Sequence, residues 1–211
     1  MPRGRHGLSP EFVARNQRER LIAGLIQALY EVGYEKTTVS LIGQRAAVSK
    51  SDFYKHFKSK DDCFIAAYDT AIDRIRGRLQ EVCEEVREAE WAVRVDHTVG
   101  ALLQLFTAEP ALASIALVEG LRAGRGVYDR YQAALEAFVD DLRRGAPSGP
   151  GGAEVPAATG EAVVGGVASM LGRRLLVGEA ERLPDLFPEI LEFILAAYLG
   201  GEEARRIVSA G

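Results

Sequence analysis

Residues 33–60 read GYEKTTVSLIGQRAAVSKSDFYKHFKSK, and this segment predicts two short helices joined by a tight turn. Thr37-Thr38 is a suitable N-cap for the first helix, which is expected to end near residue 46. Residues 47–48 form the turn, and the second helix occupies residues 49–57. Two amphipathic helices that cross steeply over such a turn make a helix-turn-helix.

The second helix separates apolar and polar side chains onto opposite faces. Phe53 and Phe57 are four residues apart, so they lie on one face and are expected to be buried. The other face offers hydrogen-bond donors of the kind that enter a major groove, namely Lys50, Ser51, Tyr54, Lys55 and, at its edge, His56. The segment therefore predicts a DNA-binding head, although His56 could equally be a solvated helix residue.

Two serines each precede an acid by three residues, Ser49 before Asp52 and Ser59 before Asp62. This is the spacing of a capping box, in which the serine accepts from the helix and the acid reaches back. Asp52 has a second interpretation, because a carboxylate would repel phosphates but could accept from a cytosine amino group. The capping box is the simpler interpretation, and both remain open at this point.

The rest of the chain has the periodicity of helices, and no segment alternates as a strand does. Gly33 is placed to end a helix over residues 10–32, which precedes the two short ones. The Gly- and Pro-rich segment 145–156 is expected to be a loop. The prediction is an all-α protein of about nine helices, with a three-helix helix-turn-helix domain over residues 1–60 and a helical bundle over residues 61–211. Besides the two short ones, helices are expected over residues 10–32, 60–85, 89–107, 110–122, 125–144, 157–180, 185–199 and 202–209.

Charge is distributed unevenly along the 211 residues, whose formal net charge is −4. Residues 1–60 carry eleven basic and five acidic side chains, a balance of +6, whereas the remainder carries fifteen and twenty-five, a balance of −10. A basic head on an acidic body suggests that the head meets a polyanion. Chance alone could also produce such an asymmetry.

Several protein classes are disfavoured by what the sequence lacks. It has no run of about 20 apolar residues, as a membrane span would need, and its basic start does not lead into the apolar stretch of a signal peptide. Cys63 and Cys83 show no disulfide or zinc spacing, and His6 and His97 lack metal-ligand spacing. We therefore expect a cytoplasmic protein with no metal, no cofactor and no membrane partner.

An enzyme is one alternative, since a helical body with His97, Glu109 and Glu119 could host acid–base chemistry. The sequence contains no nucleophile elbow, phosphate loop or dinucleotide-binding glycine motif after a strand. We therefore expect no catalytic residues and no turnover.

The order and spacing of the residues around the helix-turn-helix resemble the DNA-binding signature of the TetR family of bacterial transcription regulators. The resemblance is carried by residues 33–39, 42, 46–50, 53–57 and 59–60. Three residues depart from the pattern. Ser51-Asp52 stands where the family often has glycine and a small hydroxyl residue, and Leu41 stands where an acid is common. Beyond the head, only length and helical layout resemble the family.

The resemblance implies which residues meet DNA. Thr38 and Lys60 would bind phosphates, whereas Tyr54 and His56 would contact phosphates or a thymine methyl group. The full set of expected DNA-binding residues is Thr38, Ser49, Lys50, Ser51, Tyr54, Lys55, His56 and Lys60. Further basic groups that could reach the DNA backbone or an adjacent minor groove are Arg15, Arg18 and the tail Arg3-Gly4-Arg5.

A single recognition helix reads only a few base pairs, so the resemblance implies a homodimer on a palindromic duplex operator. The last two long helices would form the dimer interface, through Gly166, Ser169, Gly172, Ile190, Ile194 and Tyr198. The same apolar faces could instead belong to the core of one chain.

The helical bundle is also expected to bind an unknown small-molecule effector in a mostly apolar pocket. Arg122 and Arg125 would suit an anionic effector if they are not simply exposed. The expected function is a repressor that the effector releases from its operator; an activator, or a regulator controlled without a small ligand, remains an alternative. The candidate pocket residues, which could also be plain core, are Trp91, His97, Phe106, Tyr128, Tyr131 and Phe138.

Overall fold

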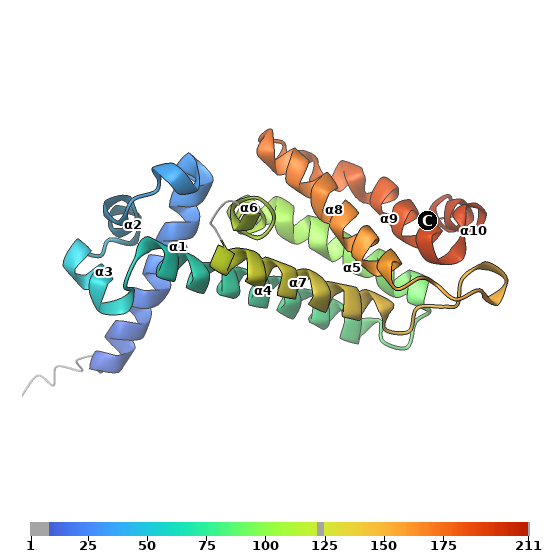
Figure 1. The fold of residues 1–211 in the computed structure, drawn as a ribbon, viewed down its shortest axis with the longest axis horizontal. Coiled ribbons are helices and arrows are strands. Elements are labelled where there is room, and N and C mark those ends of the chain that lie inside the picture. The colour runs from blue at the N-terminus through green and yellow to red at the C-terminus, as the bar shows by residue number, and fades with distance from the viewer. Residues whose placement is uncertain (1–8, 122–124, 211) are drawn as a thin grey trace, which may run out of the picture. The chain divides into compact units, whose positions relative to one another are not determined.

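The computed structural model describes residues 9–121 and 125–210, and every regular element in these residues is a helix (Figure 1). The predicted all-α fold is therefore confirmed, with ten α-helices and three short 3₁₀ helices in the described part. In chain order they are α1 (Pro10–Lys36), α2 (Val39–Ala46), α3 (Lys50–His56), α4 (Lys60–Glu85), α5 (Trp91–Ala108), α6 (Pro110–Leu117), η1 (Glu119–Leu121), α7 (Arg125–Arg143), η2 (Pro150–Gly152), α8 (Ala158–Leu176), η3 (Ala180–Leu186), α9 (Phe187–Leu199) and α10 (Gly201–Val208).

The chain forms two compact units that divide within α4, the first extending to Asp69 and the second beginning at Thr70. The sequence placed this division after residue 60. It lies further along because the first turns of α4 belong to the core of the N-terminal unit. The side chains of Cys63 and Phe64 are fully buried there, and the Phe64 ring packs edge-on against Tyr34 at 5.3 Å between centroids.

Both ends of α1 are set by local chemistry. Ser9 caps the first turn, since its hydroxyl accepts from the Phe12 backbone N–H at 3.1 Å. Gly33, the predicted end of this helix, has φ 76° and ψ 169°, a conformation that glycine adopts most readily. The helix is broken there, and one further turn leads to Lys36. Thr37 then donates its hydroxyl to the Gly33 carbonyl at 2.8 Å.

Two glycines allow close backbone approach in the N-terminal unit, one between helices and one between a helix and the turn that follows it. A Cβ on Gly24 of α1 would lie 2.9 Å from the Ile42 carbonyl oxygen in α2. A Cβ on Gly43 of α2 would lie 2.6 Å from the carbonyl oxygen of Val48, in the turn after that helix. Both separations are too short for real atoms, so α2 can hold this position only without side chains at these two sites.

The C-terminal unit is a bundle in which α8 packs on α6 and α7, α5 packs on η3 and α9, and α10 packs on α9. Trp91 helps to fix the start of α5, because its indole N–H donates to the Leu142 carbonyl at 2.9 Å and its ring packs against Tyr198 at 4.9 Å between centroids. The buried core of this unit includes Val99, Leu103, Phe106, Ile115, Leu171, Leu183, Ile190 and Leu195.

Some helix ends in this unit differ from the predicted ones because the local backbone conformation ends the helix earlier. α8 ends at Leu176 instead of residue 180, because Gly178 takes φ 77° and the Glu179 N–H bonds back to the Arg174 carbonyl at 2.9 Å. The segment 145–156, expected to be a loop, contains the short η2. Pro184 lies within η3, immediately before α9.

Among the described residues, no single helix is long and apolar enough to cross a membrane. α5 and α6 meet that criterion only together, as a pair bent by 110°, and core helices of soluble proteins meet it too. The described residues also contain no group of three or more His, Cys, Asp or Glu side chains that could hold a metal ion.

We predict that Gly43→Ala lowers the free energy of unfolding of the N-terminal unit by about 1–3 kcal/mol, because the new methyl group meets backbone that must shift. Urea unfolding monitored by far-UV circular dichroism measures the change, and Trp91, the single tryptophan, reports on the C-terminal unit by its fluorescence. The control is Gly77→Ala in α4, where the new Cβ has no atom within 4 Å apart from its chain neighbours and the backbone of its own helix. It is expected to stabilise by up to about 1 kcal/mol, and equal effects of the two changes would contradict the packing argument.

Candidate nucleic-acid interface

The turn between α2 and α3 is held by backbone groups. Ala47 adopts the left-handed conformation, with φ 51° and ψ 46°, which costs a non-glycine residue about 1–2 kcal/mol. Two hydrogen bonds close the end of α2, from Ala47 N–H to the Gln44 carbonyl at 3.4 Å and from Val48 N–H to the Gly43 carbonyl at 2.9 Å. The Arg20 guanidinium of α1 donates to the Ala47 carbonyl at 3.1 Å. The direction in which α3 leaves the turn is therefore well determined.

α3 buries one face and exposes the other. Phe53 and Phe57 are buried, as predicted, with their ring centroids 5.7 Å apart. The Arg18 guanidinium lies over the Phe57 ring at 4.9 Å, so the side chain of Arg18 is anchored at the edge of this core. The residues of the opposite face that are exposed are Ser49, Lys50, Ser51, Tyr54 and Lys55.

A network of polar contacts runs along the exposed face of α3. The Ser49 hydroxyl caps the helix by accepting from the Asp52 N–H at 3.0 Å, and it donates to the Asp52 carboxylate at 2.7 Å. The Ser51 and Ser49 hydroxyl oxygens are 2.9 Å apart. Lys55 donates to the other Asp52 oxygen at 2.6 Å. This bond and the one from Ser49 hold the pKa of Asp52 below its usual value.

Only half of the capping box predicted at Ser49 and Asp52 is formed. The serine half is present, but the Asp52 carboxylate accepts from Ser49 and Lys55 side chains and does not reach back to a backbone N–H. At the start of α4 the acid does reach back, since Asp62 accepts from the Lys58 N–H at 2.9 Å while Ser59 accepts from the Asp62 N–H at 3.1 Å. The two capping patterns are therefore not equivalent, and the carboxylate of Asp52 is not needed to cap α3.

Three other predicted DNA contacts have partners within the protein. Thr38 is exposed and caps α2, accepting from the Leu41 N–H at 3.2 Å. A His56 ring nitrogen lies 3.1 Å from the Gln17 side-chain oxygen. Lys60 donates to the Tyr34 carbonyl at 2.8 Å and sits over the Tyr34 ring at 3.9 Å. A phosphate would have to compete with the Tyr34 carbonyl for Lys60.

Several contacts of the N-terminal unit were not predicted from the sequence. The Arg45 guanidinium of α2 pairs with the Glu31 carboxylate of α1 at 2.6 Å, and Tyr34 donates its hydroxyl to Asp61. Burial is the main cause that raises the pKa of Tyr34, and that hydrogen bond adds to it. These partners lie on different helices, 14 and 27 residues apart, so no local spacing rule could have found them. The predicted tail Arg3-Gly4-Arg5 lies outside the described residues.

Comparison with known proteins agrees with this geometry. Residues 21–67, which include the whole helix-turn-helix, match the model of the bacterial regulatory proteins of the tetR family. The helix-turn-helix head of this chain is therefore of the TetR-family type. An HTH-type transcriptional regulator of Mycobacterium tuberculosis is 35% identical over 78 residues, which is 35% of this chain and 38% of that protein. The chain therefore spans little more than a third of the length of this relative.

Solved structures extend the likeness from the head to the whole fold. The fatty acid degradation regulator FadR from Bacillus halodurans aligns with a TM-score of 0.71 and 16% identity, covering 90% of this chain and 96% of that one. FadR from Bacillus subtilis, solved in complex with stearoyl-CoA, aligns with a TM-score of 0.70 and 16% identity, covering 85% and 98%. At these identities the likeness concerns the fold alone.

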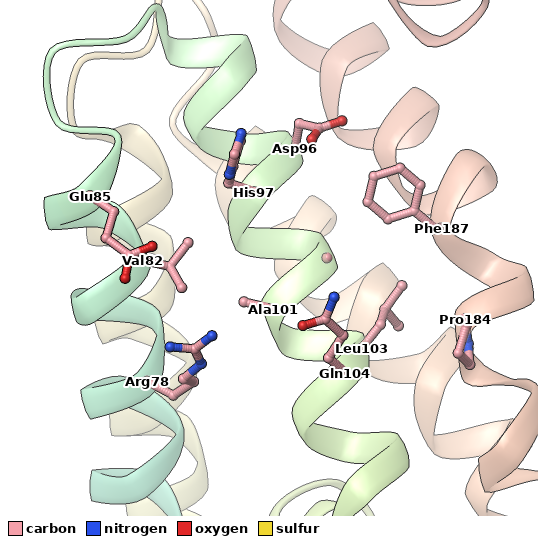
Figure 2. Close-up of a pocket in the computed structure, with 11 residues that line it drawn as sticks. Arg78, Val82, Glu85, Asp96, His97, Ala101, Leu103, Gln104, Pro184 and Phe187 are labelled. Carbon is pink, nitrogen blue, oxygen red and sulfur yellow. The ribbon is translucent and has the colours of Figure 1, made fainter. Parts of the chain in front are cut away.

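The C-terminal unit contains a cleft of about 440 Å³ (Figure 2). It is bordered by α4, α5 and the segment where η3 leads into α9, and a Cβ on Gly100 of α5 would lie 3.6 Å from the Phe187 ring. Its lining residues are Arg78, Val82, Glu85, Asp96, His97, Gly100, Ala101, Leu103, Gln104, Pro184 and Phe187.

Of the predicted pocket residues, His97 alone lines this cleft. Trp91, Phe106 and Tyr131 are buried in the core, and Tyr128 is exposed. Phe138 does not line the cleft, and the side chains of Arg122 and Arg125 lie outside what the structure describes. The prediction favoured aromatic residues, whereas Phe187 is the one aromatic hydrocarbon ring among the residues that line the cleft and five of those eleven residues are polar or charged. Polar residues carry no periodic signal in the sequence.

The predicted dimer residues also need correction. Gly172, Ile190, Ile194 and Tyr198 are buried within a single chain, so they have almost no surface left for a partner. Gly166 faces its own chain, because a Cβ there would lie 2.9 Å from the Phe193 ring. Ser169 alone of the six is exposed. The large apolar side chains that α8, its end and α9 do expose are Leu176, Val177 and Phe193.

We predict that Ser49→Ala destabilises the N-terminal unit by about 1 kcal/mol, because the Asp52 N–H loses the side chain that caps it. The measurement is urea unfolding monitored by far-UV circular dichroism. Ser40→Ala is the matched control, since Ser40 is an exposed α2 residue whose hydroxyl makes no hydrogen bond to any described residue. It should change stability by less than about 0.5 kcal/mol. The capping role of Ser49 is refuted if both variants unfold together with the wild type.

Proposed function

We propose that this protein is a sequence-specific, DNA-binding transcription regulator that places α3 in the major groove of its operator. The observation that carries the proposal is the exposed donor face of α3, held on a fixed turn within a TetR-family head. Lys50 supports it further, because this exposed lysine makes no ion pair with any described residue and can meet a phosphate or a base edge.

We further propose that the protein acts as a homodimer on a palindromic site. One short recognition helix covers only a few base pairs, so specificity requires two half-sites related by two-fold symmetry. The outer face of α8 and α9 is the proposed interface, since Ser169 and Phe193 are exposed there and Leu176 and Val177 extend the apolar surface. Exposed apolar surface of this kind is typical of protein contacts. A protein that binds operator DNA would act in the cytoplasm.

The cleft in the C-terminal unit is the proposed effector site. Its volume of about 440 Å³ is within the range of small-molecule pockets. Glu85 and Asp96 line it and have no ion-pair partner among the described residues, whereas Arg78 is paired with Glu81 at 3.3 Å. This balance favours an effector that carries an amine or another cation, with Phe187 as an apolar contact. A coenzyme A thioester, such as the ligand of the B. subtilis FadR structure, is disfavoured as the effector here. Its negatively charged phosphates would be repelled by these carboxylates.

The proposed mechanism is repression relieved by the effector. α4 begins in the N-terminal unit and supplies Arg78, Val82 and Glu85 to the cleft, so a ligand that shifts α4 can alter the DNA-binding head. A coupling free energy of about 1–3 kcal/mol would weaken operator binding roughly 5- to 150-fold.

Selection of bound sequences from random duplex DNA tests the function. We expect a palindromic motif, bound by a protein that sediments as a dimer. Affinity for that motif should fall about a thousandfold or more between 50 and 200 mM salt. Each phosphate contact of the dimer releases a counterion from the DNA, and added salt opposes that release. Enrichment of no sequence by the folded wild-type protein would contradict the proposal, and a non-palindromic motif would contradict the dimer.

A paired compound library tests the effector. Aromatic amines and quaternary ammonium compounds, each matched with a carboxylic acid of similar size, are titrated into the protein–operator complex and release is measured by fluorescence anisotropy. Only the cations should release DNA, and Asp96→Asn should weaken that response at least tenfold. Glu84→Gln is the control, because Glu84 neighbours Glu85 on α4 but does not line the cleft. Release by the acids, or equal loss of response in both variants, would refute the site.

A further inference from the structure

Asp52 and Lys55 form a polar pair on the exposed face of α3, and any role of this pair in reading bases rests on the proposed DNA-binding function. The Lys55 ammonium lies 2.6 Å from one Asp52 oxygen, and the Ser49 hydroxyl lies 2.7 Å from the other. The side chain of Asp52 is 31% exposed and that of Lys55 is 70% exposed. The pair is therefore fixed by contacts within the helix and remains accessible to a partner.

Both members retain hydrogen-bonding capacity. A carboxylate has about four acceptor positions and an ammonium has three donors. The contacts to Lys55 and Ser49 use two acceptor positions of Asp52, and the contact to Asp52 uses one donor of Lys55. About two acceptor positions and two donors are left, side by side on a face that would meet DNA.

A carboxylate on such a face needs a reason, because phosphates repel it. Capping does not supply one, since the Ser49 hydroxyl caps α3 and the Asp52 carboxylate accepts from no backbone N–H. In the major groove, guanine presents two acceptors, N7 and O6, and its paired cytosine presents the N4 amino donor beside them. A lysine next to an aspartate matches that edge, with the donors on guanine and the acceptors on cytosine.

We propose that Asp52 and Lys55 together read one G·C base pair in each half-site, Lys55 donating to guanine and Asp52 accepting from the cytosine amino group. Ser49 positions the carboxylate by its hydroxyl contact. The Asp52–Lys55 bond orients both groups before DNA arrives, which reduces the ordering that binding must impose.

The test compares the motifs selected by the wild-type protein, Asp52→Asn and Lys55→Met. The wild-type motif should contain one symmetry-related pair of G·C positions, preferred about fivefold to a hundredfold over A·T. Lys55→Met should lose that preference. Asp52→Asn keeps the shape of the side chain, and it should lose the preference for cytosine and gain tolerance of adenine, which asparagine reads in the major groove. All other positions should keep their preferences.

A measurement on the unaltered protein guards against variants that fail to fold. Wild-type binding is compared on the selected site and on the same site with 7-deazaguanine at the inferred position, which removes only the N7 acceptor. A several-fold weakening is expected there and not at guanines elsewhere in the duplex. Glu203→Gln serves as the control variant, since it breaks an exposed Glu–Arg pair of the same i,i+3 spacing in α10 of the other unit. It should leave the motif unchanged.

The outcomes separate this inference from the proposed function. A clear wild-type motif that both variants preserve, with affinity changed equally on all sequences, would overturn the inference and assign Lys55 to a phosphate. An unaffected 7-deazaguanine site would overturn it as well. Failure of the folded wild-type protein to enrich any sequence would overturn the proposed function itself.

Discussion

The helix-turn-helix depends on how closely α2 can approach α1. Gly24 leaves no room for a methyl group between the two helices, and Gly43 leaves none between α2 and the turn that follows it, because each would place a Cβ within 3 Å of a carbonyl oxygen. The left-handed Ala47 then turns the chain, and Arg20 of α1 bonds its carbonyl. The recognition helix has only seven residues, too few to be stable alone. Its orientation is therefore set by this packing and by the burial of Phe53 beneath it.

How much of the structure could be predicted from the sequence depends on how far apart in the chain the interacting residues lie. Local chemistry was predictable: α2 and α4 have the expected bounds, and Thr38, Ser49 and Ser59 cap as their spacing indicated. The position of the division between units, inside α4, was not, because it is set by burial of Cys63 and Phe64 against residues distant in sequence. The contacts of Lys60 with Tyr34, likewise, are invisible to any pattern of neighbouring residues.

The C-terminal unit shows where apolar periodicity stops being informative. A repeat of apolar residues on α9 indicates that one face is buried, but it does not say against what. Ile190 and Ile194 pack inside their own chain, while Phe193 between them is exposed. The periodicity was correct and its assignment to a dimer interface was wrong for those residues. The cleft was missed for the opposite reason, since Glu85, Asp96 and Gln104 are polar residues that could lie on any solvated helix face.

The formal charge of the head overstates the charge that is free to meet DNA. Within residues 9–60, four basic groups take part in ion pairs or hydrogen bonds: Arg45 with Glu31, Lys55 with Asp52, and Arg20 and Lys60 with backbone carbonyls. A phosphate that recruits Lys60 must replace a 2.8 Å hydrogen bond, so part of the electrostatic gain is offset. Exposed ion pairs contribute little to stability, yet here they fix where each cation points. These internal contacts therefore reduce the attraction of the head for any polyanion but fix the directions of its side chains. Fixed side-chain directions are what a protein needs to distinguish one duplex sequence from another.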